Sequence, residues 1–249
     1  MTRNLAAYHF VAIDDPQALA ASIRAQAGAR ELRGTALVAG EGLNLFLAGA
    51  PEAVDGFVSW LRGDARFAEL RTKFSESAHV PFARLKVKVK QEIIAFRREN
   101  ASPLAGQAPG VCPQTLATWI ARGSDDAGRE VILLDTRNRE EVGHGSFAGA
   151  LTLPIDNFTE LPAALEPHRD ALAGATVVSF CTGGIRCEKA ALWMRASGLE
   201  HVLQLDGGIL GYFEAVGGAG YEGRCFVFDA RVALDPELRP LVDQSLDPV

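Results

Sequence analysis

Between Val177 and Trp193 the sequence passes from an apolar run, through a short glycine-containing loop, into a run rich in Ala, Glu, Lys and Leu. The apolar run at 176–180 predicts a buried strand, and the run at 187–196 predicts a helix because strong helix formers dominate it. A strand that leads directly into a helix is typical of α/β domains, where ligands lie outside the carboxyl ends of the strands. Together with the other strand and helix patterns between 112 and 218, this order predicts a doubly wound parallel sheet.

The loop between this strand and helix begins with a thiol and ends with a guanidinium. Its residues are Cys181, Thr182, Gly183, Gly184, Ile185 and Arg186. Backbone N–H groups in such a loop, and the N-terminus of the following helix, stabilise an anion and lower the pKa of a thiol. We therefore predict that Cys181 is a catalytic thiolate, that loop amides point toward it and that solvent reaches it. The alternative is a buried structural cysteine, which the neighbouring glycines and arginine argue against.

The length of the loop indicates what it holds. Four residues separate Cys181 from Arg186, one fewer than in the related phosphatase loops that hold a phosphate. A shorter ring suits a single sulfur atom carried on the cysteine. The loop resembles the active-site loop of rhodanese-like sulfurtransferases, and this resemblance implies a persulfide on Cys181.

A charged segment follows the strand predicted at 131–134 and matches the rhodanese-like pattern as well. Its charged positions are Asp135, Arg137 and Glu141. We expect these residues to form a charge-paired network that braces the loops at the carboxyl ends of the strands, a structural role more than a catalytic one. Rhodanese-like domains usually have Gly-His where this sequence has Gly145-Ser146, so the preceding histidine is assigned no role.

The front of the chain predicts a second, smaller α/β unit. Strand patterns and amphipathic helix patterns alternate as strand–helix–strand–strand–helix–strand, which is the order of a ferredoxin-like fold. The predicted strands are 6–13, 34–39, 42–48 and 69–75, and the predicted helices are 15–26 and 51–62. The fold class is therefore α/β, with a ferredoxin-like N-terminal domain followed by a rhodanese-like doubly wound domain.

A strictly alternating segment beside this unit carries its basic residues on one strand face. These residues are Arg84, Lys86, Lys88 and Lys90. In an otherwise acidic protein such a strand is a candidate surface for the phosphate backbone of RNA. The alternative is a solvated edge strand that its lysines protect from aggregation.

The length and composition of the chain indicate how it divides into domains. At 249 residues the chain is long enough for two domains. We expect a ferredoxin-like domain at 1–99, a linker at 100–111, a rhodanese-like catalytic domain at 112–218 and a C-terminal tail at 219–249. No signal peptide or membrane span is evident, so we expect a cytoplasmic protein with reduced cysteines. No C-x2-C pair is present, so we expect no metal site.

Several segments together are similar to the bacterial tRNA uridine hydroxylase family, over nearly the whole chain. They are Glu41–Asn44, the lysine strand, Asp135–Asn138, Cys181–Ala190 and Cys225–Asp229. The resemblance implies oxygen-dependent 5-hydroxylation of the wobble uridine in tRNA, with Cys181 essential, molecular oxygen as co-substrate and tRNA as partner. It implies neither a DNA nor a membrane partner. Longer family members carry a Cys-rich C-terminal segment that this sequence lacks, so we expect no metal-linked role of that kind here.

The residues are also compatible with two other functions. A plain sulfurtransferase would take sulfur from thiosulfate or a persulfide onto Cys181 and pass it to a thiol or cyanide. The other function is that of a binding module without catalytic turnover, and the intact cysteine and arginine argue against it. No flavin, haem or non-haem iron signature is evident, so no cofactor is expected. Cys187 either resolves an oxidised Cys181 or is a buried helix residue.

Overall fold

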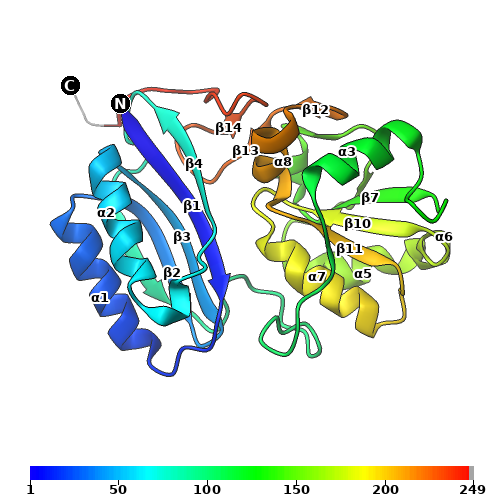
Figure 1. The fold of residues 1–249 in the computed structure, drawn as a ribbon, viewed down its shortest axis with the longest axis horizontal. Coiled ribbons are helices and arrows are strands. Elements are labelled where there is room, and N and C mark those ends of the chain that lie inside the picture. The colour runs from blue at the N-terminus through cyan, green and yellow to red at the C-terminus, as the bar shows by residue number, and fades with distance from the viewer. Residues whose placement is uncertain (247–249) are drawn as a thin grey trace. The chain divides into compact units, whose positions relative to one another are not determined.

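The computed structural model describes residues 1–246 and divides into two compact units, drawn as a ribbon in Figure 1. One unit comprises Met1–Ile94, Phe228–Val232 and the described part of Arg239–Val249. The other comprises Ala95–Val227 and Ala233–Leu238. We refer to them as the ferredoxin-like unit and the rhodanese-like unit.

The ferredoxin-like unit is a sheet with two helices on one of its faces (Figure 1). Its elements are β1 (Thr2–Phe10), α1 (Pro16–Ala29), β2 (Arg33–Ala39), β3 (Gly42–Gly49), α2 (Pro51–Arg62), β4 (Thr72–Ser77) and β5 (Leu85–Val89). The strand order is β4-β1-β3-β2-β5, and only β5, which pairs with β2, runs parallel to its neighbour. This order confirms the predicted ferredoxin-like fold and adds β5 at one edge.

Local sequence explains where these helices begin. The Asp15 side chain accepts a hydrogen bond from the backbone N–H of Ala18 at 2.9 Å, and Pro16 occupies the first turn of α1. Helix α2 likewise starts at a proline, Pro51. The core lies between these helices and the sheet, because alternate residues of β3 and one face of α2 are fully buried.

The last strand of this ferredoxin fold starts later than predicted. Asp64 caps a short 3₁₀ turn at Ala65–Phe67, and both Phe67 and Leu70 are buried against the core. The chain therefore enters β4 only at Thr72, where the prediction had placed a strand from residue 69. Leu70 is therefore buried because it anchors this turn to the core and not because it pairs in the sheet.

The rhodanese-like unit contains a five-stranded parallel sheet with helices on both sides (Figure 1). Its strands are β6 (Gly110–Val111), β7 (Val131–Asp135), β9 (Leu151–Thr152), β10 (Thr176–Phe180) and β11 (Val202–Leu205). Its main helices are α3 (Pro113–Arg122), α7 (Ile185–Ala196) and α8 (Gly208–Val216). The order β6-β11-β10-β7-β9, with every pair parallel, confirms the predicted rhodanese-like sheet.

Short elements close the ends of this sheet. The short helices are α4 (Arg139–Val142), α5 (Leu161–Leu165) and α6 (Arg169–Leu172). Two small antiparallel pairs join β8 (Gly145–Phe147) to β12 (Tyr221–Gly223) and β13 (Cys225–Phe226) to β14 (Ala233–Leu234). The stretch expected as one tail, 219–249, thus contributes strands to the rhodanese-like unit and further residues to the other unit.

The rhodanese-like unit begins before the expected linker at 100–111. Phe96 is fully buried, stacks on Phe158 with a ring-centroid distance of 4.5 Å and meets Trp193 edge-on at 6.1 Å. These contacts anchor the chain to this unit directly after Ile94. Among the described residues, no helix has the length and apolar character needed to span a membrane.

Candidate active site

Cys181 lies directly after β10, and α7 begins four residues later at Ile185. Strand β10 is the central strand of its sheet and is buried along its whole length. Gly184 takes a φ of 101°, a left-handed conformation that only glycine adopts readily, and so turns the chain into the helix. Gly183 has no positive φ, and a Cβ placed on it meets nothing within 4 Å, so its presence is not a requirement of the loop's backbone.

The sulfur of Cys181 is surrounded by hydrogen-bond donors. The backbone N–H of Gly184 donates to it with a nitrogen–sulfur distance of 3.1 Å, and the backbone N–H of Arg186 and the thiol of Cys187 also donate. Burial raises the pKa of the Cys181 thiol, but these donors and the charge of Arg186 outweigh burial and bring the pKa below its usual value. The predicted orientation of the loop amides is therefore present in the structure.

The predicted solvent access is wrong for this conformation. Cys181 has an exposed fraction of 0%, and Thr182 and Arg186 are buried as well. The backbone of the α8 N-terminus lies against the loop, because the N–H groups of Ile209 and Leu210 donate to the carbonyl oxygens of Cys181 and Thr182 at 2.9 and 3.0 Å. A reaction at this thiol therefore requires the loop to open.

Arg186 is paired with a carboxylate instead of standing alone at the end of the loop. Its two terminal nitrogens lie 2.6 Å from the two carboxylate oxygens of Glu141, a bidentate geometry. Burial raises the pKa of Glu141, but the charge and hydrogen bonds of Arg186 hold it below the usual value. Since Glu141 sits in α4 and its side chain also accepts from the N–H of Asn138, it connects the cysteine loop to the segment after β7.

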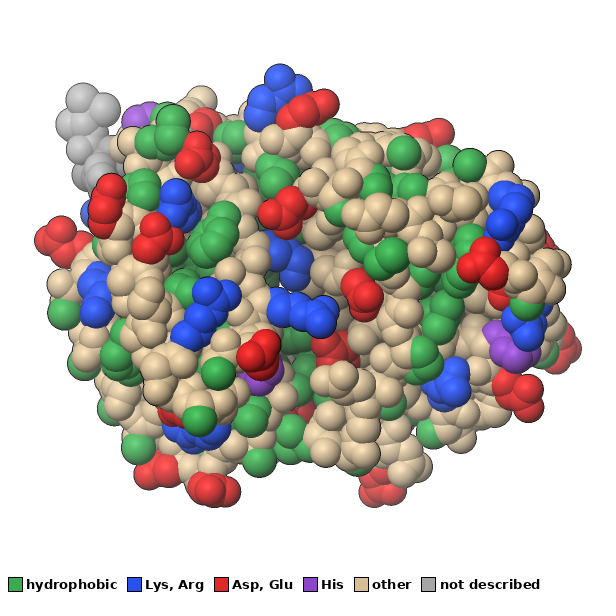
Figure 2. Space-filling view, in the orientation of Figure 1, with side chains coloured by type: hydrophobic (Ala, Val, Ile, Leu, Met, Phe, Trp, Pro, Cys, Tyr) green, Lys and Arg blue, Asp and Glu red, His purple; other side chains and the backbone are tan. Residues whose placement is uncertain are grey.

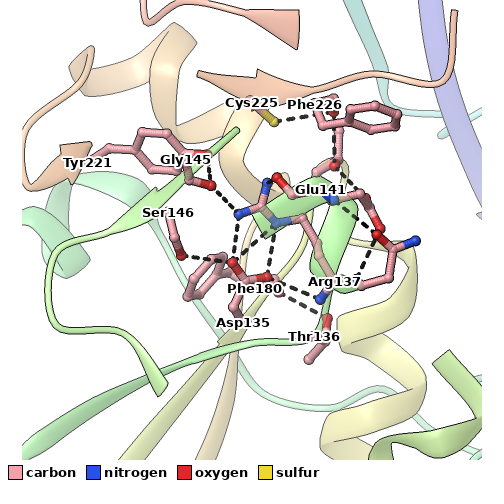
Figure 3. A network of polar contacts seen from close by, with 12 residues as sticks. Asp135, Thr136, Arg137, Glu141, Gly145, Ser146, Phe180, Tyr221, Cys225 and Phe226 are labelled. Atoms are coloured by element: carbon pink, nitrogen blue, oxygen red, sulfur yellow. Dashed lines mark hydrogen bonds and ion pairs between the residues drawn. The ribbon is translucent and has the colours of Figure 1, made fainter. Parts of the chain in front are cut away.

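The other two charged residues of the predicted network form an ion pair of their own, and Arg137 also donates to the backbone carbonyl of Glu141 at 3.4 Å (Figure 3). Arg137 donates to Asp135 through its Nε at 2.9 Å and a terminal nitrogen at 2.6 Å, and both side chains are fully buried. Arg137 also donates to the Gly145 carbonyl at 2.6 Å, and Ser146 donates to Asp135 at 2.8 Å. Ser146 thus donates to this network from the position where rhodanese-like domains usually carry histidine.

Residues that were not among the predicted site residues cover this network. Tyr221 donates through its hydroxyl to the Gly145 carbonyl at 2.9 Å, and Phe226 accepts a 3.4 Å hydrogen bond from Thr182 through its backbone oxygen. Burial raises the pKa of the neighbouring Cys225 to about 12, so that thiol stays protonated. Aromatic and apolar residues directly after the last helix were the available signal, since a disordered tail rarely carries them.

Gly208 permits the close contact between α8 and the cysteine loop. Its φ is +62°, and a Cβ built on it would lie 2.5 Å from the carbonyl oxygen of Cys181 and 2.6 Å from the nitrogen of Gly184. Both contacts are with backbone atoms, so no side-chain rotation relieves them. The cysteine loop can keep this shape because residue 208, which packs against it, has no side chain.

We expect Gly208→Ala to destabilise the protein by about 3 kcal/mol, since it combines a left-handed residue with overpacking. Gly174→Ala is the matched control, because a Cβ at Gly174 meets nothing within 4 Å and its φ is not positive. Urea unfolding of both variants measures the difference. Equal stabilities would show that the loop and α8 separate at little cost.

Cys187 contacts Cys181 in the structure, although the sequence left its role open. Both thiols are fully buried, and the Cys187 thiol lies 3.8 Å from the hydroxyl of Thr136. Burial and the neighbouring Cys181 sulfur raise the pKa of Cys187, so its proton remains in place to donate to the Cys181 thiolate.

We expect Cys187→Ala to raise the pKa of Cys181, because the variant removes a donor to the thiolate. Cys187→Ser keeps a donor at this position and should leave the pKa closer to that of the unmodified protein. The ultraviolet absorbance of the thiolate, corrected with a Cys181→Ser sample, gives both midpoints as the pH is raised. If the alanine and serine variants titrate together with the unmodified protein, Cys187 does not stabilise the thiolate.

The candidate RNA-binding residues belong to the other unit. Lys86 and Lys88 are exposed on β5, and Arg84 and Lys90 flank that strand. Strand β5 is an edge strand, as the alternative interpretation required. Within the described residues, no cluster of three or more His, Cys, Asp or Glu side chains has a geometry that would hold a metal ion.

Domain-family comparisons match the two units in turn. Residues 2–93 match the UPF0176 acylphosphatase-like domain, and residues 116–215 match the rhodanese-like domain. Among solved structures, the chain is similar to the rhodanese-like domain of an Anabaena protein, with 22% identity, a TM-score of 0.37 and coverage of 46% of this chain and 79% of that chain. The two domain matches define a rhodanese-like protein with an acylphosphatase-like N-terminal domain.

Curated relatives extend the similarity over nearly the whole chain. The chain is 69% identical to the tRNA uridine(34) hydroxylase of Xanthomonas euvesicatoria, over 98% of each protein. It is 62% identical to the tRNA uridine(34) hydroxylase of Xylella fastidiosa, over 98% of this chain and 95% of that protein. The chain belongs to the tRNA uridine(34) hydroxylase family, which confirms the resemblance inferred from its residues.

Proposed function

We propose that this protein hydroxylates uridine 34 of tRNA. One observation carries the proposal: relatives named tRNA uridine(34) hydroxylase are 62–69% identical to it and align along almost their entire length. The cysteine loop, the ion pair that closes it and the ferredoxin-like unit all lie within the aligned region.

Cys181 acts as the nucleophile in this proposal. The thiolate adds to C6 of the uracil ring, and the displaced electron pair moves to C5 and the C4 carbonyl. C5 then attacks the oxidant and forms the new C–O bond. Loss of the C5 proton and departure of the thiolate restore the ring double bond. The donors around the sulfur support this role, because they favour the thiolate both as nucleophile and as leaving group.

Molecular oxygen is the oxidant in this proposal. One of its atoms remains on C5, and the other leaves as water after accepting two electrons and two protons from a dithiol reductant, which is oxidised to a disulfide. Because Cys181 is buried, the uracil ring reaches it only after the segment at the α8 N-terminus and β13 has moved away from the loop. Loop opening that accompanies substrate binding is common among enzymes.

A sulfurtransferase is the second candidate, and the match of residues 116–215 to the rhodanese-like domain favours it. In that reaction the Cys181 thiolate attacks the outer sulfur of thiosulfate, releases sulfite and keeps the sulfur as a persulfide. Cyanide or a thiol then accepts that sulfur. The thiolate-stabilising donors serve this reaction equally well, so the loop alone does not distinguish the two functions.

The experiment uses purified protein, tRNA that lacks the modification, a dithiol reductant and isotopically labelled oxygen gas. Nucleoside mass spectrometry should find 5-hydroxyuridine at position 34 that carries the label. Product without the label would remove molecular oxygen from the proposal and leave the hydroxylation. Rapid thiocyanate formation from thiosulfate and cyanide, with no change in tRNA in the assay or in a strain deleted for the gene, would replace the proposal with the sulfurtransferase.

A further inference from the structure

The face of the ferredoxin-like sheet opposite α1 and α2 combines aromatic rings with lysines. Helices α1 and α2 cover the other face, where alternate strand residues form the core (Figure 1). The strand register shows which residues share the face opposite the helices. One row across all five strands consists of Lys73, Ala6, Phe46, Thr35 and Lys86.

The next row on the same face again has an aromatic ring on an interior strand and a lysine on β5. It consists of Tyr8, Asn44, Leu37 and Lys88, on β1, β3, β2 and β5. Tyr8 and Phe46 are partly exposed, and Lys88 is exposed. Rings therefore occupy the centre of this surface on β1 and β3, and lysines occupy both edges. We call Tyr8, Phe46, Lys73, Lys86 and Lys88 the sheet platform.

The charge of the platform contrasts with the rest of the protein. Its three lysines stand out in a chain with a formal net charge of −6. On the face of the molecule drawn in Figure 2, acidic and basic side chains are interspersed instead of forming one broad basic field. Lys73 places its Nζ 5.7 Å from the centre of the Tyr8 ring, which keeps a cation beside an aromatic surface.

We propose that the sheet platform binds unpaired nucleotides of the substrate RNA, with bases stacked on Phe46 and Tyr8 and phosphates held by Lys86, Lys88 and Lys73. Aromatic rings on central strands and cations at the edges form the chemistry that reads single-stranded RNA, because unpaired bases expose their faces and their phosphates together. A duplex hides its bases within the stack. This inference rests on the proposed function and specifies which part of a tRNA this unit holds, namely a single-stranded loop.

Neighbouring segments contact this face of the sheet at two places along the strands. Asn44 donates to the carbonyl of Ile93 at 3.4 Å at one end, and Arg231 donates to the hydroxyl of Ser75 at 2.6 Å at the other. Phe46 lies in the row between these two contacts, whereas Tyr8 shares a row with Asn44, and both rings are partly exposed. An edge strand protected by lysines would explain Lys86 and Lys88, but it does not explain aromatic rings on the interior strands β1 and β3.

The test measures binding of a fluorescent anticodon stem–loop RNA to the full-length protein by anisotropy at several salt concentrations. Phe46→Leu removes the ring and keeps apolar volume, and we expect it to weaken binding about tenfold with an unchanged salt dependence. Replacement of both Lys86 and Lys88 by Gln should weaken binding and reduce the slope of log affinity against log salt by about 0.7 for each lost phosphate contact. An unlabelled RNA without secondary structure should compete, whereas a blunt duplex of equal length should not.

Matched controls separate ring and charge from folding. Phe74→Leu changes an aromatic residue on β4 that pairs with Leu5, on the opposite side of the sheet from Lys73, and should leave binding unchanged. Arg66→Gln removes a cation beside Phe67, which lies in the core on the helix side, and should leave the salt slope unchanged. Thermal unfolding confirms that each variant is folded.

The outcomes separate this inference from the proposed function. If the unmodified protein does not bind the stem–loop at all, the proposed tRNA substrate fails. If it binds, and neither Phe46→Leu nor the double lysine variant differs from the controls, the platform is not the RNA surface while the proposed function stands. Competition by the duplex equal to that by the unpaired RNA would also contradict stacking.

Discussion

Replacement of Cys181 by serine should abolish hydroxylation of uridine 34, with a loss of at least about 10³-fold in rate, as expected when a nucleophile is removed. A serine hydroxyl is not ionised by the donors that stabilise the Cys181 thiolate, so it forms no adduct with C6. Nucleoside mass spectrometry of tRNA incubated with the variant measures the loss. The same variant should form no thiocyanate from thiosulfate, because both candidate reactions use this sulfur.

Cys112→Ser is the matched control for this experiment. Cys112 is exposed at the start of α3, where its thiol lies 3.2 Å from the Thr115 hydroxyl, so its replacement should leave the rate within about twofold. Hydroxylation by the Cys181→Ser variant at a rate close to that of the control would show that the loop cysteine is not the nucleophile. The family assignment would then stand without a mechanism.

Replacement of Arg137 by methionine should destabilise the rhodanese-like unit by about 3–5 kcal/mol, the usual cost of breaking a buried ion pair from one side. Asp135 would remain fully buried with Ser146 and the backbone N–H of residue 137 as its remaining donors. Urea unfolding followed by the fluorescence of Trp119 and Trp193, which both lie in this unit, measures the change.

An exposed ion pair in the same unit provides the comparison. Arg139 and Asp156 contact each other with a similar two-point geometry, but their side chains are 59% and 63% exposed. Arg139→Met should therefore cost less than about 1 kcal/mol. The double variant with Asp135→Asn and Arg137→Met should lose less stability than Arg137→Met alone, since it leaves no unpaired charge. A loss for Arg137→Met as small as that for Arg139→Met would show that water or a rearrangement compensates Asp135.

Cys181 is buried, although its sulfur already has the hydrogen-bond donors that stabilise a thiolate. The donors around the sulfur are already in place while the thiol is closed, so the thiolate is stabilised before the substrate arrives. Protection of this kind suits the proposed reaction with an oxidant, because an exposed thiolate oxidises readily. Variants at Gly208, which change the contact between α8 and the loop, therefore test stability and access together.

Most of the fold was predictable because its signals are local. Alternation at two-residue spacing marks the strands of the ferredoxin-like unit, and proline and aspartate mark the helix starts. The run of residues 176–187 predicted a strand, a turn and a helix without reference to the rest of the chain. Those elements appear at Thr176–Phe180 and Ile185–Ala196.

The sequence by itself therefore determined the two fold types, the order of their elements and the position of a cysteine at the end of a central strand. Only the tertiary structure decided that Glu141 pairs with Arg186, 45 residues away, while Asp135 pairs with Arg137. It also decided that Cys187 contacts the Cys181 sulfur and that the Cys181 thiol is closed to solvent. The physical reason is that periodicity and capping act between near neighbours, whereas ion pairing and burial depend on which distant segments the folded sheet brings together.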